Sequence, residues 1–182
     1  MTSALIVIDM LNPYDHDDAE PLKESVRGML DELQALIAGA GEEGLRTIYV
    51  NDHHGDWSAG PTEIVQRAMS GAAPELVEPV LPPDQVPFIV KARHSIFYQT
   101  LLEYLLRNEE IGRLVYAGQV TEQCILYSAL DGYLRNFEVV VATNAVAHIS
   151  DELAAAAIQM METNMHAQLA AGVDEVFAAI RA

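Results

Sequence analysis

Short apolar runs, each bounded by polar or turn residues, recur along the chain. Runs without alternation between apolar and polar positions are typical of strands buried on both faces of a parallel sheet. This pattern predicts strands at residues 4–8, 47–50, 86–90, 114–117 and 138–142, with a last strand at 174–177.

Between these runs, apolar residues recur with the spacing of an amphipathic helix. The clearest case is residues 21–38, which are followed by the helix-ending Gly39 and Gly41. Further helices are predicted at 61–69, from a cap at Ser95 to Leu106, from Cys124 to Leu134, and at 151–170. The prolines between residues 74 and 87 predict an ordered loop.

The alternation of strands and helices predicts an α/β fold. Because parallel strands need crossover helices that cover the sheet, we expect a three-layer Rossmann-like sandwich with a mainly parallel sheet of about six strands and helices on both faces. The chain has 182 residues, of which 51% are hydrophobic. This size and composition predict a single domain that spans residues 1–182.

Charge limits the classes of partner. The formal net charge is -17, and the chain holds only 10 Lys and Arg residues. Nucleic acids and anionic membrane surfaces bind clustered basic residues, so neither is expected as a partner. The N-terminal sequence has no basic leader, and no run approaches the roughly 20 apolar residues of a membrane span, so we expect a soluble, cytoplasmic protein.

The only cysteine, Cys124, lies at a predicted strand-to-helix turn. The free N–H groups and the dipole of a helix N-terminus favour a thiolate, so this position predicts a lowered cysteine pKa. Thr121 is a candidate N-cap of the same helix. The alternative interpretation is that Cys124 is a small buried apolar residue. A lone cysteine excludes an internal disulfide, and zinc-finger spacing is absent.

Two further polar residues follow predicted strands, Asp9 after the first and Lys91 after the third. Ligand chemistry in open parallel sheets gathers outside the carboxyl ends of the strands. Asp9, Lys91 and Cys124 would therefore share one edge of the sheet as base, cation and nucleophile. Considered singly, Asp9 could be a turn residue and Lys91 a solvent-exposed strand end.

The loop after residues 47–50 is unusually polar and contains Asp52, His54 and Trp57. Its Asp-x-His spacing fits a metal-binding pair, but a solvated polar loop is the simpler interpretation. The turn after the first strand lacks the glycines of a dinucleotide site. Leu11 stands where dehalogenase-type phosphatases usually have a second Asp, so neither of these enzyme classes fits.

Four motifs in order resemble those of a known family. They are LIVIDM at residues 5–10, YVND at 49–52 with Trp57, VK at 90–91 with HS at 94–95 and FY at 97–98, and AGQVTEQC at 117–124. Together they resemble the isochorismatase-like cysteine hydrolases, which include nicotinamidases, carbamoyl-sarcosine hydrolases and ureidoacrylate hydrolases. The resemblance covers nearly the whole chain.

The resemblance implies a mechanism. Asp9 would be the general base, Lys91 the triad cation and Cys124 the nucleophile. The backbone N–H groups of Val120 and Cys124 would form an oxyanion hole, with a cis peptide between Gln119 and Val120. The implied reaction is hydrolysis of the C–N bond of a small carboxamide, ureido or carbamoyl compound through a thioester acyl-enzyme. No cofactor is implied, and the family tends to form homo-oligomers.

Departures from the family affect the metal site. Glu122 stands where the family usually has Asp, which keeps an acidic group in the first helical turn. Nicotinamidases use an Asp-x-His pair and a further His as metal ligands. Asp52 and His54 match the pair, but the next histidine is His94, inside the lysine motif. We therefore expect no required metal.

Substrate recognition and reaction type have alternatives. Trp57, Phe97 and Tyr98 are candidates to line a flat, partly apolar pocket, although each could be a core residue. Isochorismatases attack an enol ether, so ether hydrolysis is one alternative reaction. A non-catalytic binding or assembly protein on the same fold is another, suggested by the methionine-rich segment at 160–165.

Overall fold

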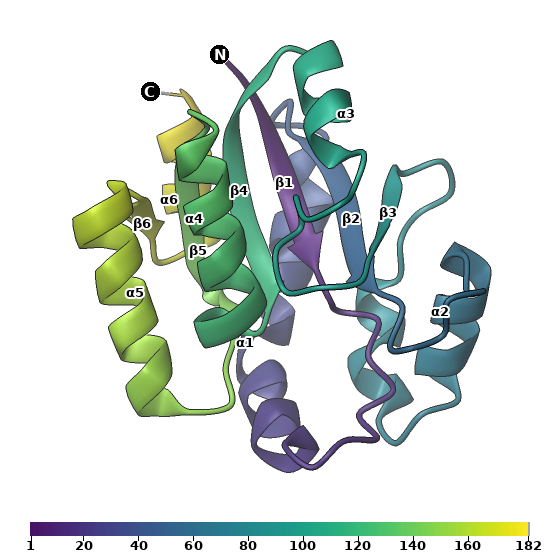
Figure 1. Cartoon of the computed structure of the whole chain (residues 1–182). Coiled ribbons are helices and arrows are strands. Elements are labelled where there is room, and N and C mark those ends of the chain that lie inside the picture. The colour runs from purple at the N-terminus through teal and green to yellow at the C-terminus, as the bar shows by residue number, and fades with distance from the viewer. Residues whose placement is uncertain (182) are drawn as a thin grey trace.

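The computed structural model describes residues 1–181 and contains a six-stranded sheet (Figure 1). All neighbouring strands pair in parallel, in the order β3-β2-β1-β4-β5-β6. The strands are β1 (Thr2–Ile8), β2 (Arg46–Asp52), β3 (Phe88–Lys91), β4 (Ile111–Gln119), β5 (Glu138–Ala147) and β6 (Gln168–Ala170). The predicted α/β class with a parallel sheet of this size is confirmed.

Helices connect successive strands and cover the sheet. They are α1 (Ala19–Ala40), α2 (Pro61–Met69), α3 (Leu102–Asn108), α4 (Leu126–Leu134), α5 (Asp151–Met165) and α6 (Val173–Arg181). A short π-helical turn, Thr121–Ile125, leads into α4. Within residues 1–181, none of these helices is long and apolar enough to cross a membrane.

The central strand β1 separates two apolar cores, because its side chains alternate between the faces of the sheet. Leu5 and Val7 pack in one core with α1 and α6. Ala4, Ile6 and Ile8 pack in the other core with α3, α4 and α5. The sheet therefore lies between two helical layers (Figure 1), which explains why its strands are apolar without alternation.

The helix predicted from Ser95 begins only at Leu102, so the first part of that prediction is wrong. The segment before Leu102 forms turns, which side-chain to backbone hydrogen bonds hold in place. The Phe97 N–H donates to Ser95 Oγ, and Thr100 Oγ1 donates to the Ile96 carbonyl. Such local bonds offer the backbone an alternative to a helix.

The C-terminal strand is also misplaced in the prediction. Residues 174–177 belong to α6, and the edge strand β6 lies earlier, at Gln168–Ala170. Asp174 and Glu175 lie in the first turn of α6, where carboxylates favour a helix. Val176 then packs into the core that α6 shares with α1. Burial on one side of a helix explains an apolar cluster that resembled a strand.

Other predicted elements differ at their boundaries. α5 ends at Met165, because His166 adopts a left-handed conformation with φ of 54°. β5 continues to Ala147, beyond its predicted end. The proline-rich segment contains two single-turn 3₁₀ helices, Pro74–Leu76 and Glu78–Val80, within the predicted loop.

Strand order sets the position of the candidate site. β1 and β4 are neighbours at the centre of the sheet, and the chain proceeds outward from them in opposite directions. Ligand sites in such sheets lie outside the carboxyl ends of the strands where the order reverses. Asp9 follows β1 at this point, and the turn that carries Cys124 follows β4.

Gly118, near the end of β4, permits close approach of β4 to β1. Its φ is 113°, and a Cβ at this position would meet the backbone of Ile8. We predict that Gly118→Ala lowers the free energy of unfolding by about 2–4 kcal/mol, through backbone strain and overpacking. Urea denaturation followed by circular dichroism measures this change.

The matched control is Gly41→Ala. Gly41 has a helical φ of -66°, and an added Cβ would have nothing within 4 Å. Its free energy of unfolding should stay within about 0.5 kcal/mol of the parent or rise slightly. Equal stability of the two variants would contradict the interpretation of Gly118.

Candidate active site

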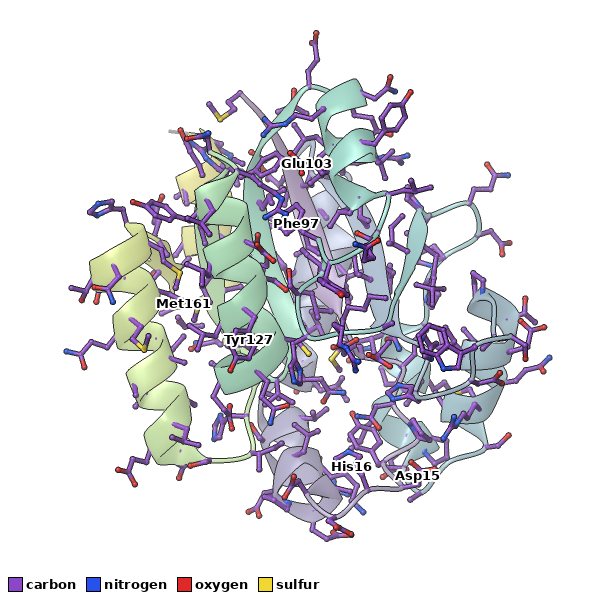
Figure 2. All side chains as sticks on the ribbon, viewed as in Figure 1. Asp15, His16, Phe97, Glu103, Tyr127 and Met161 are labelled. Carbon is purple, nitrogen blue, oxygen red and sulfur yellow. The ribbon has the colours of Figure 1, made fainter. Side chains whose placement is uncertain are left out.

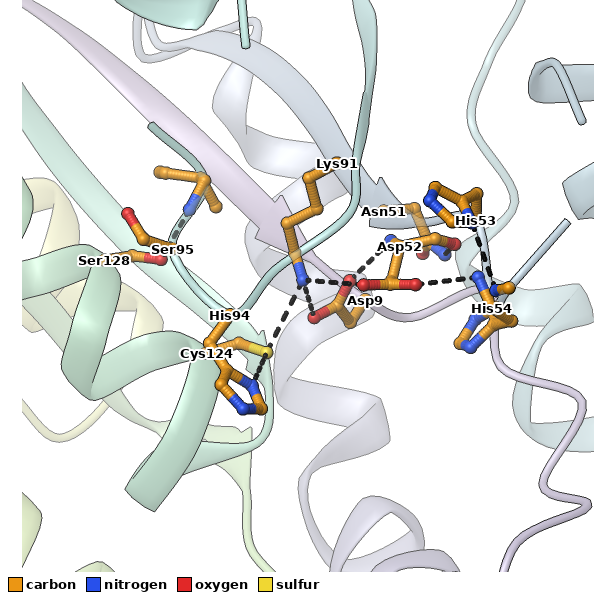
Figure 3. A network of polar contacts seen from close by, with 12 residues as sticks. Asp9, Asn51, Asp52, His53, His54, Lys91, His94, Ser95, Cys124 and Ser128 are labelled. Atoms are coloured by element: carbon orange, nitrogen blue, oxygen red, sulfur yellow. Dashed lines mark hydrogen bonds and ion pairs between the residues drawn. The ribbon is translucent and has the colours of Figure 1, made fainter. Parts of the chain in front are cut away.

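Lys91 joins the predicted triad residues at the carboxyl edge of the sheet (Figure 3). Its Nζ lies 2.8 Å from Asp9 Oδ2 and 3.5 Å from Cys124 Sγ. Asp52 Oδ2 lies 3.8 Å from the same ammonium. The charged residues come from the ends of β1, β2 and β3, and the thiol comes from the turn after β4. The structure thus brings Asp9, Lys91 and Cys124 together.

Hydrogen bonds fix the backbone and both carboxylate oxygens of Asp9. Its φ is 54°, and its N–H donates to the Val50 carbonyl at 3.0 Å. Its own carbonyl accepts a hydrogen bond from Gln119 Nε2 at 2.6 Å. The Asp52 N–H donates to Asp9 Oδ1 at 2.8 Å, which leaves Oδ2 for Lys91. The carboxylate is therefore held in one orientation.

The thiol lies in a turn that is anchored to β5. Cys124 belongs to the π-helical turn between β4 and α4 and is 8% exposed. Thr121 Oγ1 donates to the Ala147 carbonyl at 2.9 Å. Thr121 is therefore not the helix cap that the sequence predicted, and Val120 occupies the N-cap position without a side-chain hydrogen bond.

The peptide bond between Gln119 and Val120 is cis, as the resemblance implies. The Val120 carbonyl accepts hydrogen bonds from the N–H groups of Gln123 and Ile125, each at 3.1 Å. For the Val120 N–H itself, the part of the chain that the structure describes offers no hydrogen-bond acceptor. An unpaired donor thus lies beside the turn that carries the thiol.

Glu122 ties the same turn to the start of α5. Its Oε1 accepts hydrogen bonds from the N–H groups of Ile149 and Ser150, at 3.0 and 2.9 Å. Ser150 is the N-cap of α5. The acidic side chain that replaces the usual Asp of the family therefore holds the thiol turn against the next loop.

The charges around Cys124 favour its protonated form. Burial raises the pKa of the Cys124 thiol, and the negative charge of Asp9 raises it further. The Lys91 ammonium lowers this pKa, but by less than the other two effects raise it. The lowered pKa that the helix N-terminus predicted is therefore wrong for the resting site.

Lys91 stays charged in spite of its burial. Removal from water alone would lower the pKa of its ammonium. The negative charge of Asp9 and its hydrogen bond, with a contribution from the charge of Asp52, counter this effect, and the pKa of Lys91 lies above its ordinary value. The resting site therefore holds a protonated thiol beside a permanent cation.

The residues considered as a metal pair are engaged with the protein. Asp52 Oδ1 accepts the His54 N–H at 2.7 Å, while its Oδ2 faces Lys91. His54 Nε2 lies 3.1 Å from the Leu11 carbonyl. Across residues 1–181, no group of three or more His, Cys, Asp or Glu side chains is arranged to hold a metal ion.

The three candidate pocket aromatics lie in different environments. Trp57 is 83% exposed and packs against the ring of His53, with centroids 4.5 Å apart. Phe97 is buried against Phe137 and under the guanidinium of Arg135. The structure thus places Phe97 in the apolar core that also contains Cys124.

Tyr98 lies at a shallow surface depression of about 280 Å³. His94 and Tyr127 line the same depression, and Tyr127 projects from the outward side of α4 (Figure 2). Tyr98 is therefore the aromatic candidate that shares a surface with a residue in contact with Cys124.

Sequence reasoning missed two residues of the site. His94 belongs to the lysine motif, but the sequence predicts no contact with the thiol; in the structure its Nδ1 lies 3.6 Å from Cys124 Sγ. Gln119 is fully buried, accepts a hydrogen bond from the Tyr14 hydroxyl, and donates to the Asp9 carbonyl. The sequence signal for Gln119 is a polar amide that closely follows the apolar run 114–117 and comes just before the thiol turn.

Nearly the whole chain matches one known protein family. A sequence profile described as the isochorismatase domain matches residues 3–172. The chain belongs to the isochorismatase family.

Several relatives support this assignment. An uncharacterized isochorismatase family protein, YaaI of Bacillus subtilis, is 29% identical over 91% of this chain and 92% of its own. A probable inactive nicotinamidase of Arabidopsis thaliana is 27% identical over 88% of each chain. The ureidoacrylate amidohydrolase RutB of Methylorubrum extorquens is 27% identical over 79% of this chain and 69% of its own.

Solved structures share the fold. An isochorismatase family protein from Desulfovibrio vulgaris superposes with a TM-score of 0.80 at 25% identity, covering 100% of this chain and 99% of that one. The nicotinamidase/pyrazinamidase PncA from Bacillus subtilis has a TM-score of 0.72 at 27% identity, covering 93% of this chain and 99% of its own.

Asp9 and Lys91 carry opposite charges, so removing each charge should shift the pKa of Cys124 in opposite directions. Removal of the negative charge in Asp9→Asn should lower the pKa of Cys124, and removal of the positive charge in Lys91→Met should raise it. The rate of iodoacetamide alkylation of Cys124, measured across a pH series, reports this pKa. Glu152→Gln removes an exposed charge on α5 and should leave the profile unchanged. Shifts of the same sign in both site variants would contradict this account.

Proposed function

We propose that this protein is a cysteine hydrolase that cleaves the C–N bond of a small carboxamide, ureido or carbamoyl compound through a thioester acyl-enzyme. The observation that carries the proposal is the position of the Lys91 ammonium, 2.8 Å from Asp9 and 3.5 Å from Cys124. A carboxylate and a thiol that both contact one ammonium form a base, cation and nucleophile set.

In the proposed acylation, Asp9 accepts the proton of Cys124 as the thiolate attacks the substrate carbonyl carbon. Because burial and Asp9 raise the pKa of the resting thiol, Cys124 keeps its proton until Asp9 accepts it during the attack. Lys91 stabilises the negative charge that moves between these two groups. The N–H groups of Val120 and Cys124 would donate to the carbonyl oxygen as it becomes an oxyanion.

Named relatives support the substrate class. RutB is a ureidoacrylate amidohydrolase and PncA a nicotinamidase/pyrazinamidase, and both names denote hydrolysis of amide-type C–N bonds. We propose that residues 1–182 act as one hydrolase domain of this kind. Each proposed step uses protein groups and water, so the mechanism requires no cofactor.

A non-catalytic member of the fold is the second candidate, and the Arabidopsis relative named as a probable inactive nicotinamidase favours it. The methionine-rich helix that suggested an assembly surface gives it less support. Met161 and Met165 are buried in the core, and Met160 is 46% exposed; Figure 2 shows Met161 between α5 and α4. Ether hydrolysis has no specific observation in its favour.

The test of catalysis is the Cys124→Ala variant. Purified protein is screened for ammonia or amine release from nicotinamide, carbamoylated amines, ureidoacrylate-like compounds and simple amides. For any compound that is hydrolysed, Cys124→Ala should lower kcat/KM by at least about 10³-fold while circular dichroism stays unchanged. Full activity in this variant would overturn the cysteine mechanism, and an inert protein would favour the non-catalytic candidate.

We also propose that the protein is a cytoplasmic homo-oligomer. A thiol nucleophile needs a reducing compartment to stay reduced. The outer face of α4 exposes apolar side chains, with Tyr127 at 47%, Leu130 at 40% and Leu134 at 65%. Exposed apolar patches are typical of protein interfaces.

The oligomer is tested by light scattering coupled to gel filtration. The parent should have a mass that is a multiple of 19.9 kDa, and Leu134→Glu should shift the mass toward the monomer. The control Leu153→Glu introduces the same charge on α5, at a residue that is 58% exposed. A monomeric parent protein would refute the proposal.

A further inference from the structure

Arg93 is the basic residue that the described part of the chain leaves without an ion-pair partner. The chain has 10 Lys and Arg residues, all of them within residues 1–181. The others each contact a carboxylate, and they are Lys23, Arg27, Arg46, Arg67, Lys91, Arg107, Arg113, Arg135 and Arg181. Arg93 is exposed, and among the described residues its guanidinium has neither an ion pair nor a hydrogen bond. In a protein with a net charge of -17, a free cation is an exception.

Arg93 lies beside the proposed nucleophile. It directly precedes His94, whose Nδ1 lies 3.6 Å from Cys124 Sγ (Figure 3). Consecutive Cα atoms are about 3.8 Å apart, so the long Arg93 side chain starts one residue away from a contact of the thiol. Arg93 and His94 both line the surface depression of about 280 Å³ described above. The free cation therefore shares one concave surface with a residue that contacts the thiol.

The other residues of the depression leave the charge of Arg93 uncompensated. Asp131 is the carboxylate that lines the same depression. It accepts a hydrogen bond from Ser95 and pairs with Arg135 at 2.6 Å, so its negative charge is already compensated. Aromatic and apolar side chains form much of the remaining wall, namely those of Tyr98, Tyr127 and Leu130. Arg93 is therefore available to a ligand that enters the depression.

A free guanidinium in this setting favours a carboxylate ligand. Its planar fork can donate two parallel N–H bonds to the two oxygens of a carboxylate. The apolar wall beside it lowers the local dielectric constant, which strengthens the ion pair relative to one in open solvent. At physiological salt, the fields of acidic residues elsewhere on the surface are screened beyond about 8 Å. The direct contact with Arg93 therefore outweighs the net charge of the protein for an anion bound here.

We propose that Arg93 binds a carboxylate of the substrate and makes the enzyme specific for anionic compounds, namely carboxamides, ureido compounds or carbamoyl amines that also carry a free carboxylate. This inference rests on the proposed cysteine hydrolase function and names the substrate class of the same site. The scissile carbonyl lies at Cys124, and the carboxylate lies in the depression against Arg93. Arg93 orients the substrate and takes no part in the bond changes.

The test compares acids with uncharged counterparts. Ureidoacetate is paired with hydroxyethylurea, and succinamate with butyramide, so that each pair shares the scissile group and differs in the carboxylate. The parent should favour the acid by about 10-fold or more in kcat/KM, because the uncharged compound lacks the hydrogen-bonded ion pair. Arg93→Gln should raise KM for the acid by about 10–100-fold and lower kcat by less than about threefold. Its kcat/KM for the uncharged compound should change by less than about threefold.

The matched control is Arg27→Gln. Arg27 is an arginine on α1 that is 54% exposed and pairs with Glu75, and its replacement changes the net charge by the same amount as Arg93→Gln. It should behave as the parent with every compound. An increase of NaCl from about 50 to about 500 mM should raise KM for the acid in the parent and in Arg27→Gln, but not in Arg93→Gln. Arg93→Lys keeps the charge, loses the planar fork and should give an intermediate KM.

Protection of the thiol gives a second readout, which needs no turnover. Succinate should slow iodoacetamide alkylation of Cys124 in the parent and in Arg27→Gln, but not in Arg93→Gln. Light scattering coupled to gel filtration should give Arg93→Gln the mass of the parent. A shift toward the monomer with an unchanged substrate preference would assign Arg93 to an interface between copies of the chain and overturn the proposal.

The outcomes separate this inference from the function on which it rests. If the parent hydrolyses acids and uncharged compounds equally well, or if Arg93→Gln keeps the parental preference, the role of Arg93 is refuted and the cysteine mechanism stands. If no compound is hydrolysed but succinate protects Cys124 only when Arg93 is present, carboxylate binding stands and the proposed hydrolysis fails. Protection that is absent from the parent, or equal in the parent and Arg93→Gln, would overturn carboxylate binding.

Discussion

The ion pair between Lys91 and Asp9 is the constraint on which the site depends. Their side chains are 1% and 10% exposed, so neither charge is solvated and each needs the other. Removing one partner of a buried pair typically costs about 3–5 kcal/mol, because the remaining charge is left uncompensated. β1 and β3 are separated by β2 in the sheet, so the pair can form only when all three strands are in register. The arrangement that stabilises the charges is therefore the arrangement that presents them to the thiol.

The same pair determines the state of the nucleophile. A cysteine at a helix N-terminus is expected to ionise readily, but burial and the Asp9 charge dominate at Cys124 and raise its pKa. A protonated thiol is a weak nucleophile and a poor target for oxidants, which attack the thiolate. Under the proposed mechanism, reactivity is gained when a substrate carbonyl arrives and Asp9 takes the proton. The helix terminus alone thus predicts a pKa shift in the wrong direction, because that argument omits desolvation of the thiol and the negative charge of Asp9.

Much of this could be predicted from the sequence, for identifiable reasons. The apolar run at residues 4–8 required a strand buried on both faces, and the polar residues after three such strands had to meet at one edge. Local hydrogen bonds that compete with helix formation leave no trace in hydrophobic periodicity, so the turns between Ser95 and Leu102 were missed. The same turns follow His94 directly, and its contact with Cys124 joins residues 30 positions apart. Such a contact depends on tertiary structure, and one sequence carries no signal for it.

The inner and outer sides of the thiol have different neighbours. On the inner side, the Gln119 amide and the Asp52 backbone N–H bind Asp9, so the carboxylate that pairs with Lys91 is held in one orientation. On the outer side, the exposed His94 packs against Tyr127 and lies 3.6 Å from Cys124 Sγ. Fixed charges suit stabilisation of a transition state, since they need no reorganisation during the reaction.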